Sequence, residues 1–239
     1  RMDYLLRDAY YTGVAYGTHD MDHLIANLGV VDQADRGLVR TIDSTAVRAF
    51  EDFLLARYHM FLQVYLHKTT IAFDHFLERA LEDGEFELTF PGDAKGYSRL
   101  RDSTMIERLF KAADDPKNVW SRRLVARQPA KLILMSSNAK PDEKALMAEV
   151  IAALKTAGVP CFELPSHQYL SKSLPTVEGA GGPSSMLVRR KMFGKFVYEP
   201  IERYSALLTK YNEAIDMTHL FVLPENYASA KAAISRFSA

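Results

Sequence analysis

Cysteine is almost missing from this sequence, since Cys161 is the only one among 239 residues. A single cysteine excludes an internal disulfide and a cysteine-rich zinc site, and it suits a reducing cytoplasm. Excess charge of either sign is missing too, because thirty Lys and Arg residues balance thirty Asp and Glu residues. No global charge therefore steers the protein toward nucleic acid or a membrane surface, and any anionic ligand must be held by a local basic site.

Long apolar runs and an N-terminal leader are also lacking. No apolar stretch approaches the roughly 18 residues that a bilayer-spanning helix needs, and no charged-then-apolar segment opens the chain. We therefore expect a cytoplasmic protein with no membrane partner. The chain opens inside a charged helical pattern, with no capping residue before Arg1, so we expect a further N-terminal portion to precede it.

The apolar content is sufficient for a real core. Hydrophobic residues make up 48% of the chain, enough for one large domain or two small ones. Up to residue 128 the pattern is mostly helical, and beyond Gln128-Pro129 a strand-helix-strand pattern begins. The sequence predicts a mainly α fold over residues 1–128, followed by a C-terminal α+β region over residues 129–239.

The expected elements follow from apolar spacing and from capping and turn residues. They are helices over 1–11 and 20–28, a hairpin over 29–42, a helix or pair of helices over 44–81, helices over 103–113 and 118–127, a strand-helix-strand unit over 132–135, 141–156 and 159–164, strands over 186–191 and 195–198, a helix from Ile201, a strand over 218–223, and a final helix from Pro224.

Three polar residues share one stripe of the first predicted helix. Arg1, Tyr4 and Asp8 stand at i, i+3 and i+7, which places a cation, a phenol and a carboxylate on one face. Such a stripe suits a nucleotide, because Arg neutralises phosphate, Tyr packs against a sugar ring and Asp accepts hydrogen bonds from hydroxyls. The alternative is a solvated helix face on which Asp3 and Arg7 pair, and spacing alone favours it.

A second group of polar residues interrupts the apolar region over 44–81. Arg57, Tyr65, His67 and Lys68 are its polar exceptions, and a charge on an apolar stripe needs a partner. One interpretation is a second contact for an anion, opposite the first helix. The other is that Arg57 extends its charged end to solvent at the edge of a helix interface.

The dipeptide His19-Asp20 has the residue types of a metal site but stands alone. Hydrolytic metal centres need three or more converging ligands, and no other histidine shows metal-ligand spacing such as His-Glu-x-x-His. We predict that Asp20 caps the next helix and that His19 is a loop residue.

Two motifs carry a resemblance to a known family. The opening Arg-Met-Asp-Tyr-Leu-Leu-Arg-Asp, closed by Thr12-Gly13, resembles the segment after the last metal-binding Asp in bacterial dGTPases and in the dNTP triphosphohydrolases with SAM and HD domains. The stretch from Ala56-Arg57 to Val64-Tyr65-Leu66-His67-Lys68 resembles the long helix of the same HD phosphohydrolases. Residues 102–127 and 211–232 are similar to later parts of the family.

The resemblance implies a role for each matching residue. Arg1 contacts the triphosphate, Tyr4 packs on the deoxyribose, Asp8 binds the region of the sugar 3′-hydroxyl, and Tyr65 closes the pocket around sugar and base. His67 and Lys68 match positions near a second nucleotide site between subunits. Residues 1–128 would then be the C-terminal part of an HD phosphohydrolase domain, in a homodimer or homotetramer.

The implied activity is metal-assisted hydrolysis of a dNTP to deoxynucleoside and triphosphate. Its divalent metal ion, which the sequence does not distinguish among Mg, Mn, Fe, Zn and Ni, would be held by His and Asp residues upstream of Arg1, in the same gene product or in another chain. This chain alone would then be incomplete. Two alternatives stay open: a nucleotide-binding or oligomerisation module without catalysis, and an HD phosphohydrolase acting on another nucleotide or on a nucleic-acid phosphoester.

Overall fold

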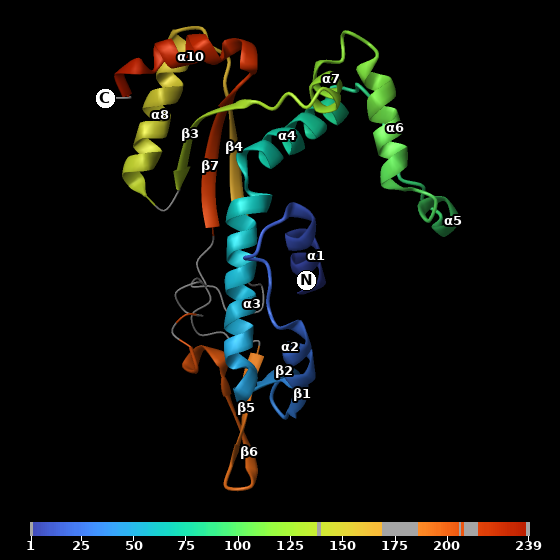
Figure 1. Cartoon of the computed structure of the whole chain (residues 1–239), viewed down its shortest axis with the longest axis vertical. Coiled ribbons are helices and arrows are strands. Elements are labelled where there is room, and N and C mark those ends of the chain that lie inside the picture. Colours follow the sequence, from blue (N-terminus) through green and yellow to red (C-terminus); the bar gives the residue numbers. More distant parts are fainter. Residues whose placement is uncertain (1, 138–139, 169–185, 206, 208–214, 238–239) are drawn as a thin grey trace. The chain divides into compact units, whose positions relative to one another are not determined.

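The computed structural model describes residues 2–137, 140–168, 186–205, 207 and 215–237 (Figure 1). The chain divides into two compact units, one of residues 1–66 and 167–215 and the other of residues 67–166 and 216–239. Each unit contains a sheet, so the fold is α+β, and the expected mainly α class is right only in part. The reason is that strands from both ends of the sequence pair with each other, which local helical periodicity does not reveal.

The first unit combines helices from the N-terminal region with strands from both regions. Its elements are α1 (Met2–Thr12), α2 (Met21–Asn27), β1 (Leu28–Gln33), β2 (Gly37–Asp43), the 3-10 turn η1 (Ser44–Ala46), α3 (Val47–Met60), the π-helical turn η2 (Phe61–Tyr65), β5 (Met186–Met192), β6 (Lys195–Pro200) and the 3-10 turn η4 (Ile201–Arg203).

The sheet of this unit has the strand order β1-β2-β5-β6. The predicted hairpin is confirmed, because β1 and β2 are antiparallel with Val31 opposite Val39, and Gly37 supplies the positive φ of +66° that the turn requires. β2 then pairs with β5 in parallel, with Ile42 opposite Val188. β5 and β6 form a second antiparallel hairpin.

Helices α2 and α3 cover one end of this sheet. Leu24, Ile42, Phe50 and Val188 belong to one buried cluster, so side chains from both helices pack against β2 and β5. Burying side chains of this size stabilises a fold by roughly 1.5–3 kcal/mol each. This core holds α3 in place, and α3 carries Arg57 of the candidate site and leads into the turn that carries Tyr65.

The apolar region over 44–81 forms a pair of helices rather than one. α3 ends at Met60 and passes into the π turn η2, and the chain then turns at His67, whose ψ of 136° is extended. The His67 ring accepts a hydrogen bond from the backbone N–H of Thr69 at 3.3 Å and so caps α4 (Lys68–Glu82). His67 therefore begins the second helix and the second unit.

The second unit contains most of the remaining helices. Its elements are α4 (Lys68–Glu82), α5 (Ala94–Tyr97), α6 (Asp102–Ala113), α7 (Val119–Val125), β3 (Lys131–Ser137), α8 (Pro141–Thr156), β4 (Phe162–Gln168), β7 (Ile215–Val222), the 3-10 turn η5 (Pro224–Asn226), α10 (Tyr227–Ala233) and the 3-10 turn η6 (Ser235–Phe237).

Both faces of the sheet in this unit are covered. Its strand order is β3-β7-β4, so the predicted strand-helix-strand unit is present with β7 inserted between its two strands. Leu220 and Val222 of β7 pack with Leu154 of α8, while Phe221, which points to the opposite face, packs with Phe76 of α4.

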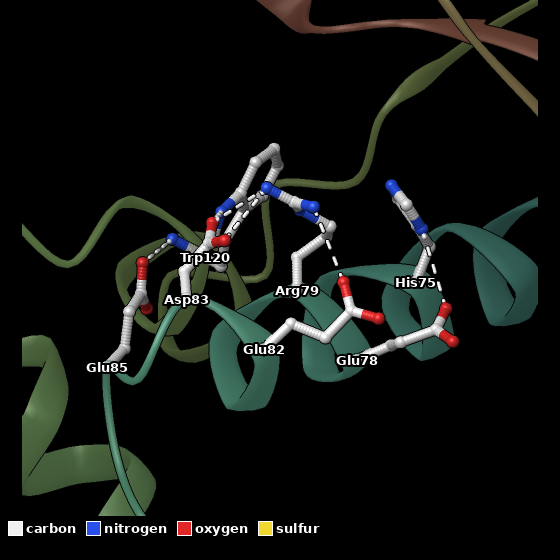
Figure 2. A network of polar contacts seen from close by, with 7 residues as sticks. All are labelled: His75, Glu78, Arg79, Glu82, Asp83, Glu85 and Trp120. Atoms are coloured by element: carbon white, nitrogen blue, oxygen red, sulfur yellow. Dashed lines mark hydrogen bonds and ion pairs between the residues drawn. The ribbon is translucent and has the colours of Figure 1, made fainter.

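A polar network joins α4 to α7 in the second unit, as Figure 2 shows. The Glu85 carboxylate accepts hydrogen bonds from the backbone N–H groups of Trp120 and Ser121, at 2.9 and 2.7 Å. Asp83 accepts one from the Trp120 indole at 2.8 Å and two from Arg79, at 2.9 Å each. Glu85 thus satisfies N–H groups that the first turn of α7 leaves open, which gives the network a structural role.

The division predicted at residue 128 does not coincide with a boundary of these compact units, because residues on both sides of it lie in the second unit. As a division into protein domains it stays a prediction. Within the part of the chain that the structure describes, no helix combines the length and the apolar character needed to cross a lipid bilayer.

Candidate functional site

The candidate site lies where α1 packs on the end of α3. Leu5 and Ala9, four residues apart on α1, are buried together with Met60 of α3. The segment after α1 packs closely against it at Gly17, because a Cβ on residue 17 would lie only 2.6 Å from the Cβ of Ala9. This close packing fixes α1, so the polar face of α1 has a defined position beside α3 and η2.

Asp8 and Tyr65 meet at this junction. The Tyr65 hydroxyl donates a hydrogen bond of 2.7 Å to Oδ2 of Asp8. The other carboxylate oxygen, Oδ1, lies 3.4 Å from Nε of Arg7, and 30% of the Asp8 side chain is exposed. Both oxygens are therefore oriented, yet the carboxylate keeps an accessible edge.

Tyr4 and Arg57 form the second contact between α1 and α3. The Arg57 guanidinium is buried and donates a hydrogen bond to the Tyr4 hydroxyl. It also lies over the ring of Phe61, 4.4 Å from the ring centroid, in cation–π geometry. The charge predicted to need a partner has one, and Arg57 does not extend to solvent as the simpler interpretation held.

The two tyrosines stand almost at right angles to each other. Their ring centroids are 6.1 Å apart with an interplanar angle of 71°, and Phe61 packs against Tyr65 at 4.9 Å. Edge-to-face aromatic pairs of this kind hold rings in fixed orientations. Tyr4 and Tyr65 thus present two rigid apolar surfaces beside the Asp8 carboxylate.

Burial raises the pKa of Tyr65 well above its ordinary value, and the hydrogen bond to Asp8 and the charge of Asp8 raise it further. The phenol is therefore neutral and stays a donor across the physiological pH range. A hydroxyl donor beside a carboxylate acceptor gives the site one group of each kind.

This arrangement suits a ligand that has both a hydroxyl and a flat or ring-shaped apolar face. The exposed edge of Asp8 can accept hydrogen bonds from a hydroxyl group, and the rings of Tyr4 and Tyr65 can pack against a sugar. Arg57 acts through Tyr4, whose hydroxyl it holds.

Most of the predicted site residues come together in the first unit. Tyr4, Asp8, Arg57 and Tyr65 contact one another in pairs. The pair that the alternative predicted is present too, since Arg7 donates to Asp3 at 3.1 Å, so α1 has a solvated face and a face directed to the site. Arg1 lies outside the described residues.

His67 and Lys68 belong to the second compact unit. The His67 ring caps the N-terminus of α4. Lys68 is an exposed residue of the first turn of this helix. Their assignment to a second nucleotide contact stays a prediction.

His19-Asp20 is arranged as predicted. Asp20 caps α2 by accepting a hydrogen bond of 3.0 Å from the backbone N–H of His23, and the His19 ring packs against Phe53 with centroids 5.2 Å apart. Among the described residues, no group of three or more His, Cys, Asp or Glu side chains could hold a metal ion. The metal ligands that the resemblance implies upstream of Arg1 stay a prediction.

Sequence reasoning missed Phe61 and the π turn that carries it. Phe61 contacts both Arg57 and Tyr65, yet in the sequence it appears only as one more apolar residue at helical spacing. The π turn η2 (Phe61–Tyr65) leaves the α-helical register just before Tyr65. π turns are rare and often occur at functional sites, but no residue pattern in this segment marks one.

Two solved structures share the fold of the chain. A hypothetical protein from Aquifex aeolicus superimposes with a TM-score of 0.69 at 24% identity, over 98% of this chain and 56% of that chain. A phosphohydrolase from Bacteroides thetaiotaomicron superimposes with a TM-score of 0.61 at 20% identity, over 93% of this chain and 60% of that one. Both solved chains are longer than this chain, which covers only 56% and 60% of them.

Curated relatives are longer as well. The uncharacterized protein YwfO of Bacillus subtilis is 32% identical over 180 residues, which cover 66% of this chain and 40% of YwfO. An uncharacterized protein of Methanocaldococcus jannaschii is 35% identical over 81 residues, which cover 34% of this chain and 18% of the relative. The chain thus spans less than half the length of either relative. The HD associated region family matches residues 19–154, more than half of the sequence, and the chain belongs to this family.

Proposed function

We propose that this chain supplies part of the substrate pocket of an HD-superfamily phosphohydrolase that converts deoxynucleoside triphosphates to deoxynucleoside and triphosphate. The observation that carries the proposal is the hydrogen bond between Tyr65 and Asp8, with the Tyr4 ring beside it. A partly exposed carboxylate beside two phenol rings is an arrangement that suits recognition of a sugar.

Two comparisons support a phosphohydrolase. Membership in the HD associated region family agrees with the relation to HD proteins that the two motifs indicate. One of the solved structures that share the fold is named a phosphohydrolase.

In this proposal each site residue has a separate task. Tyr4 and Tyr65 pack against the deoxyribose, and Asp8 accepts a hydrogen bond from its 3′-hydroxyl. Arg57 positions Tyr4 through the hydroxyl group. Arg1, three positions before Tyr4 in the sequence, contacts the triphosphate.

A divalent metal ion would supply the activated water and neutralise phosphate charge. The described residues offer no set of ligands for it, and in this proposal its ligands would come from residues outside them. The residues named above bind and orient the substrate, and none of their tasks depends on the metal.

The test uses the full-length protein, with any residues that precede Arg1. It is incubated with each of the four dNTPs and with Mg²⁺, Mn²⁺, Fe²⁺, Zn²⁺ or Ni²⁺ in turn, and released triphosphate is measured. Asp8→Asn and Tyr65→Phe should each lower kcat/KM at least about tenfold. Asp3→Asn is the matched control, because Asp3 lies on the same helix with 81% of its side chain exposed, and it should keep nearly all of the activity.

Two results would overturn the proposal. One is the absence of triphosphate release from every dNTP with every metal. The other is an equal loss of activity in Asp3→Asn and in the two site variants, which would show that the Tyr65 and Asp8 pair has no special part in the reaction. Ribonucleotides in the same panel test the alternative of a phosphohydrolase with another substrate.

A second candidate is a nucleotide-binding module without catalysis. It is favoured by the lack of a metal-ligand set among the described residues. Calorimetry would then show dNTP binding that Asp8→Asn weakens, while no triphosphate is released. The proposed hydrolase predicts both binding and release.

A further inference from the structure

β6 is an outermost strand of the sheet in the first unit. The order β1-β2-β5-β6 gives it one neighbour, β5, among the described strands. An outer strand has backbone N–H and C=O groups on one side that its own sheet does not pair, and it is therefore a template for another strand. Phe196 and Val197 of β6 are large apolar side chains that are 53% and 37% exposed, so this strand is open to a partner.

Two antiparallel copies of β6 would place complementary residues opposite each other. Its central residues are Lys195, Phe196, Val197, Tyr198 and Glu199. In an antiparallel pair centred on Val197, Lys195 stands opposite the partner's Glu199, and Phe196 stands opposite the partner's Tyr198. Val197 stands opposite its own copy.

The faces of the strand agree with this register. Side chains alternate between the two faces of a sheet, and residues directly opposite each other share a face. One face of the pair then carries the aromatic contacts of Phe196 and Tyr198. The other carries an opposite-charge pair at each end and the two valines between them. Each of these is a favourable kind of cross-strand pair.

The charged residues at the two ends of β6 are both partly or fully exposed. Lys195 is exposed and forms no ion pair with any described residue. Glu199 is 34% exposed in its side chain, with Arg190 at 3.9 Å and the Tyr204 hydroxyl donating to it at 2.8 Å. Both groups point from the same face, as an ion pair across two antiparallel copies requires.

The tip of the β5–β6 hairpin presents an exposed aromatic side chain near the proposed contact. Phe193 is fully exposed, and its φ of +47° is a conformation that bulky residues rarely adopt. If the register is continued by two positions beyond Lys195, the tip lies beside the partner's Pro200–Ile201 segment. Phe193 would then pack against the base of the other hairpin.

From these observations we propose that two copies of the protein associate along β6, antiparallel and centred on Val197. The twofold axis passes through Val197, and two four-stranded sheets become one continuous sheet. The contact is isologous, so it closes with two copies and gives a dimer. This inference does not rest on the proposed catalytic activity, because none of the nucleotide-site residues belongs to β5 or β6.

The first test uses charge reversal in the purified full-length protein. Lys195→Glu places Glu opposite Glu, and Glu199→Lys places Lys opposite Lys. Sedimentation velocity over a concentration series should show a dimer for the wild type, and each variant alone should raise the dissociation constant at least about tenfold. An equimolar mixture of the two variants restores both opposite-charge pairs and should dimerise like the wild type.

Two controls separate this contact from general damage. Tyr204→Phe removes the hydrogen bond that Glu199→Lys also loses, and it should leave the dimer unchanged. Circular dichroism of each variant shows whether the fold is intact. A wild-type protein that stays monomeric at every concentration, or a mixture that dimerises no better than its separate components, overturns the proposal.

A covalent test fixes the register. In a Cys161→Ala background, which removes the only natural cysteine, Val197→Cys places two thiols opposite each other within disulfide reach. Mild oxidation should yield a covalent dimer. Lys195→Cys is the matched control, because its two copies lie four residue positions apart along the strands, too far for a disulfide. Equal crosslinking of the two variants would mean that the copies meet through another surface.

Discussion

Removing the Tyr65 hydroxyl tests whether the candidate site is held together as the structure indicates. Tyr65→Phe keeps the ring and its contacts with Tyr4 and Phe61 but deletes the donor that binds Asp8. A hydrogen bond to a charged group is worth roughly 1.5–3 kcal/mol. Because 30% of the Asp8 side chain is exposed, water can replace part of this, and we expect a loss near the lower end, about 1–1.5 kcal/mol.

The assay is urea unfolding at neutral pH, with the free energy of unfolding compared among variants. Tyr10→Phe is the control, because Tyr10 lies on the same helix and is 80% exposed, and it should change stability by less than about 0.5 kcal/mol. Asp8→Asn and the double variant complete a double-mutant cycle. A coupling energy near zero between Tyr65 and Asp8 would refute the reasoning.

The raised pKa of Tyr65 adds a pH dependence with a defined sign. In the unfolded chain a tyrosine loses its proton near pH ~10, whereas burial and Asp8 make the folded protein retain it. The folded state therefore binds more protons above that pH, and the contribution of Tyr65 to stability falls as the pH rises further. Wild type and Tyr65→Phe should thus converge in stability on going from pH 8 to about pH 11.

Three further predictions concern packing and capping. Gly17→Ala should cost about 1–3 kcal/mol, because the added Cβ would lie 2.6 Å from its nearest neighbour; Gly92→Ala, with open space around it, should cost much less in the same thermal melts. Glu85→Ala leaves two N–H groups of α7 without their acceptor and should cost about 1–2 kcal/mol, measured through the fluorescence of Trp120, the only tryptophan. Burial lowers the pKa of His75, so its contribution to stability is complete above about pH 6.5 and is lost as the pH falls below it. An NMR titration should give a midpoint below that value, and a midpoint above it would contradict the buried environment.

Local features of the fold were accessible from the sequence because their causes are local. The first helix ends at Gly13, which has a φ of +71°, as the Thr12-Gly13 pair predicts. Asp20 caps α2, and the β1–β2 hairpin turns where the polar residues indicate. Each of these depends on residues within a few positions of one another, and side-chain chemistry fixes the backbone there.

The parallel pairing of β2 with β5 could not be predicted in the same way. Ile42 and Val188 are neighbours in the sheet, but they are far apart in sequence, and either strand would fit many apolar partners. Strand pairing of this kind depends on the packing of the whole core, in which α2 and α3 cover both strands. For that reason the expected mainly α class needed correction.

The candidate site combines both kinds of information. The i, i+4 spacing of Tyr4 and Asp8 places them on one face of α1 without further knowledge, and the buried position of Arg57 on an apolar stripe predicts that it needs a partner. The identity of that partner, Tyr4, cannot be read from either segment alone, because the two residues are brought together only when α1 packs on α3 through Leu5, Ala9 and Met60.

Phe61 shows most clearly where the sequence stops being informative. An α-helical continuation of α3 would keep Tyr65 in register with Arg57 and Phe61 at 3.6 residues per turn, whereas the π turn rotates the last residues of the segment relative to the helix. In the structure Phe61 lies under the Arg57 guanidinium and against the Tyr65 ring, so it links the two contacts that hold Tyr4 and Asp8. Phe61→Leu keeps an apolar residue there but removes both ring interactions. It should therefore weaken nucleotide binding by the full-length protein while changing its fold little, a result that calorimetry and circular dichroism together can check. If binding is unchanged, the orientation of Tyr65 depends on its hydrogen bond to Asp8 alone.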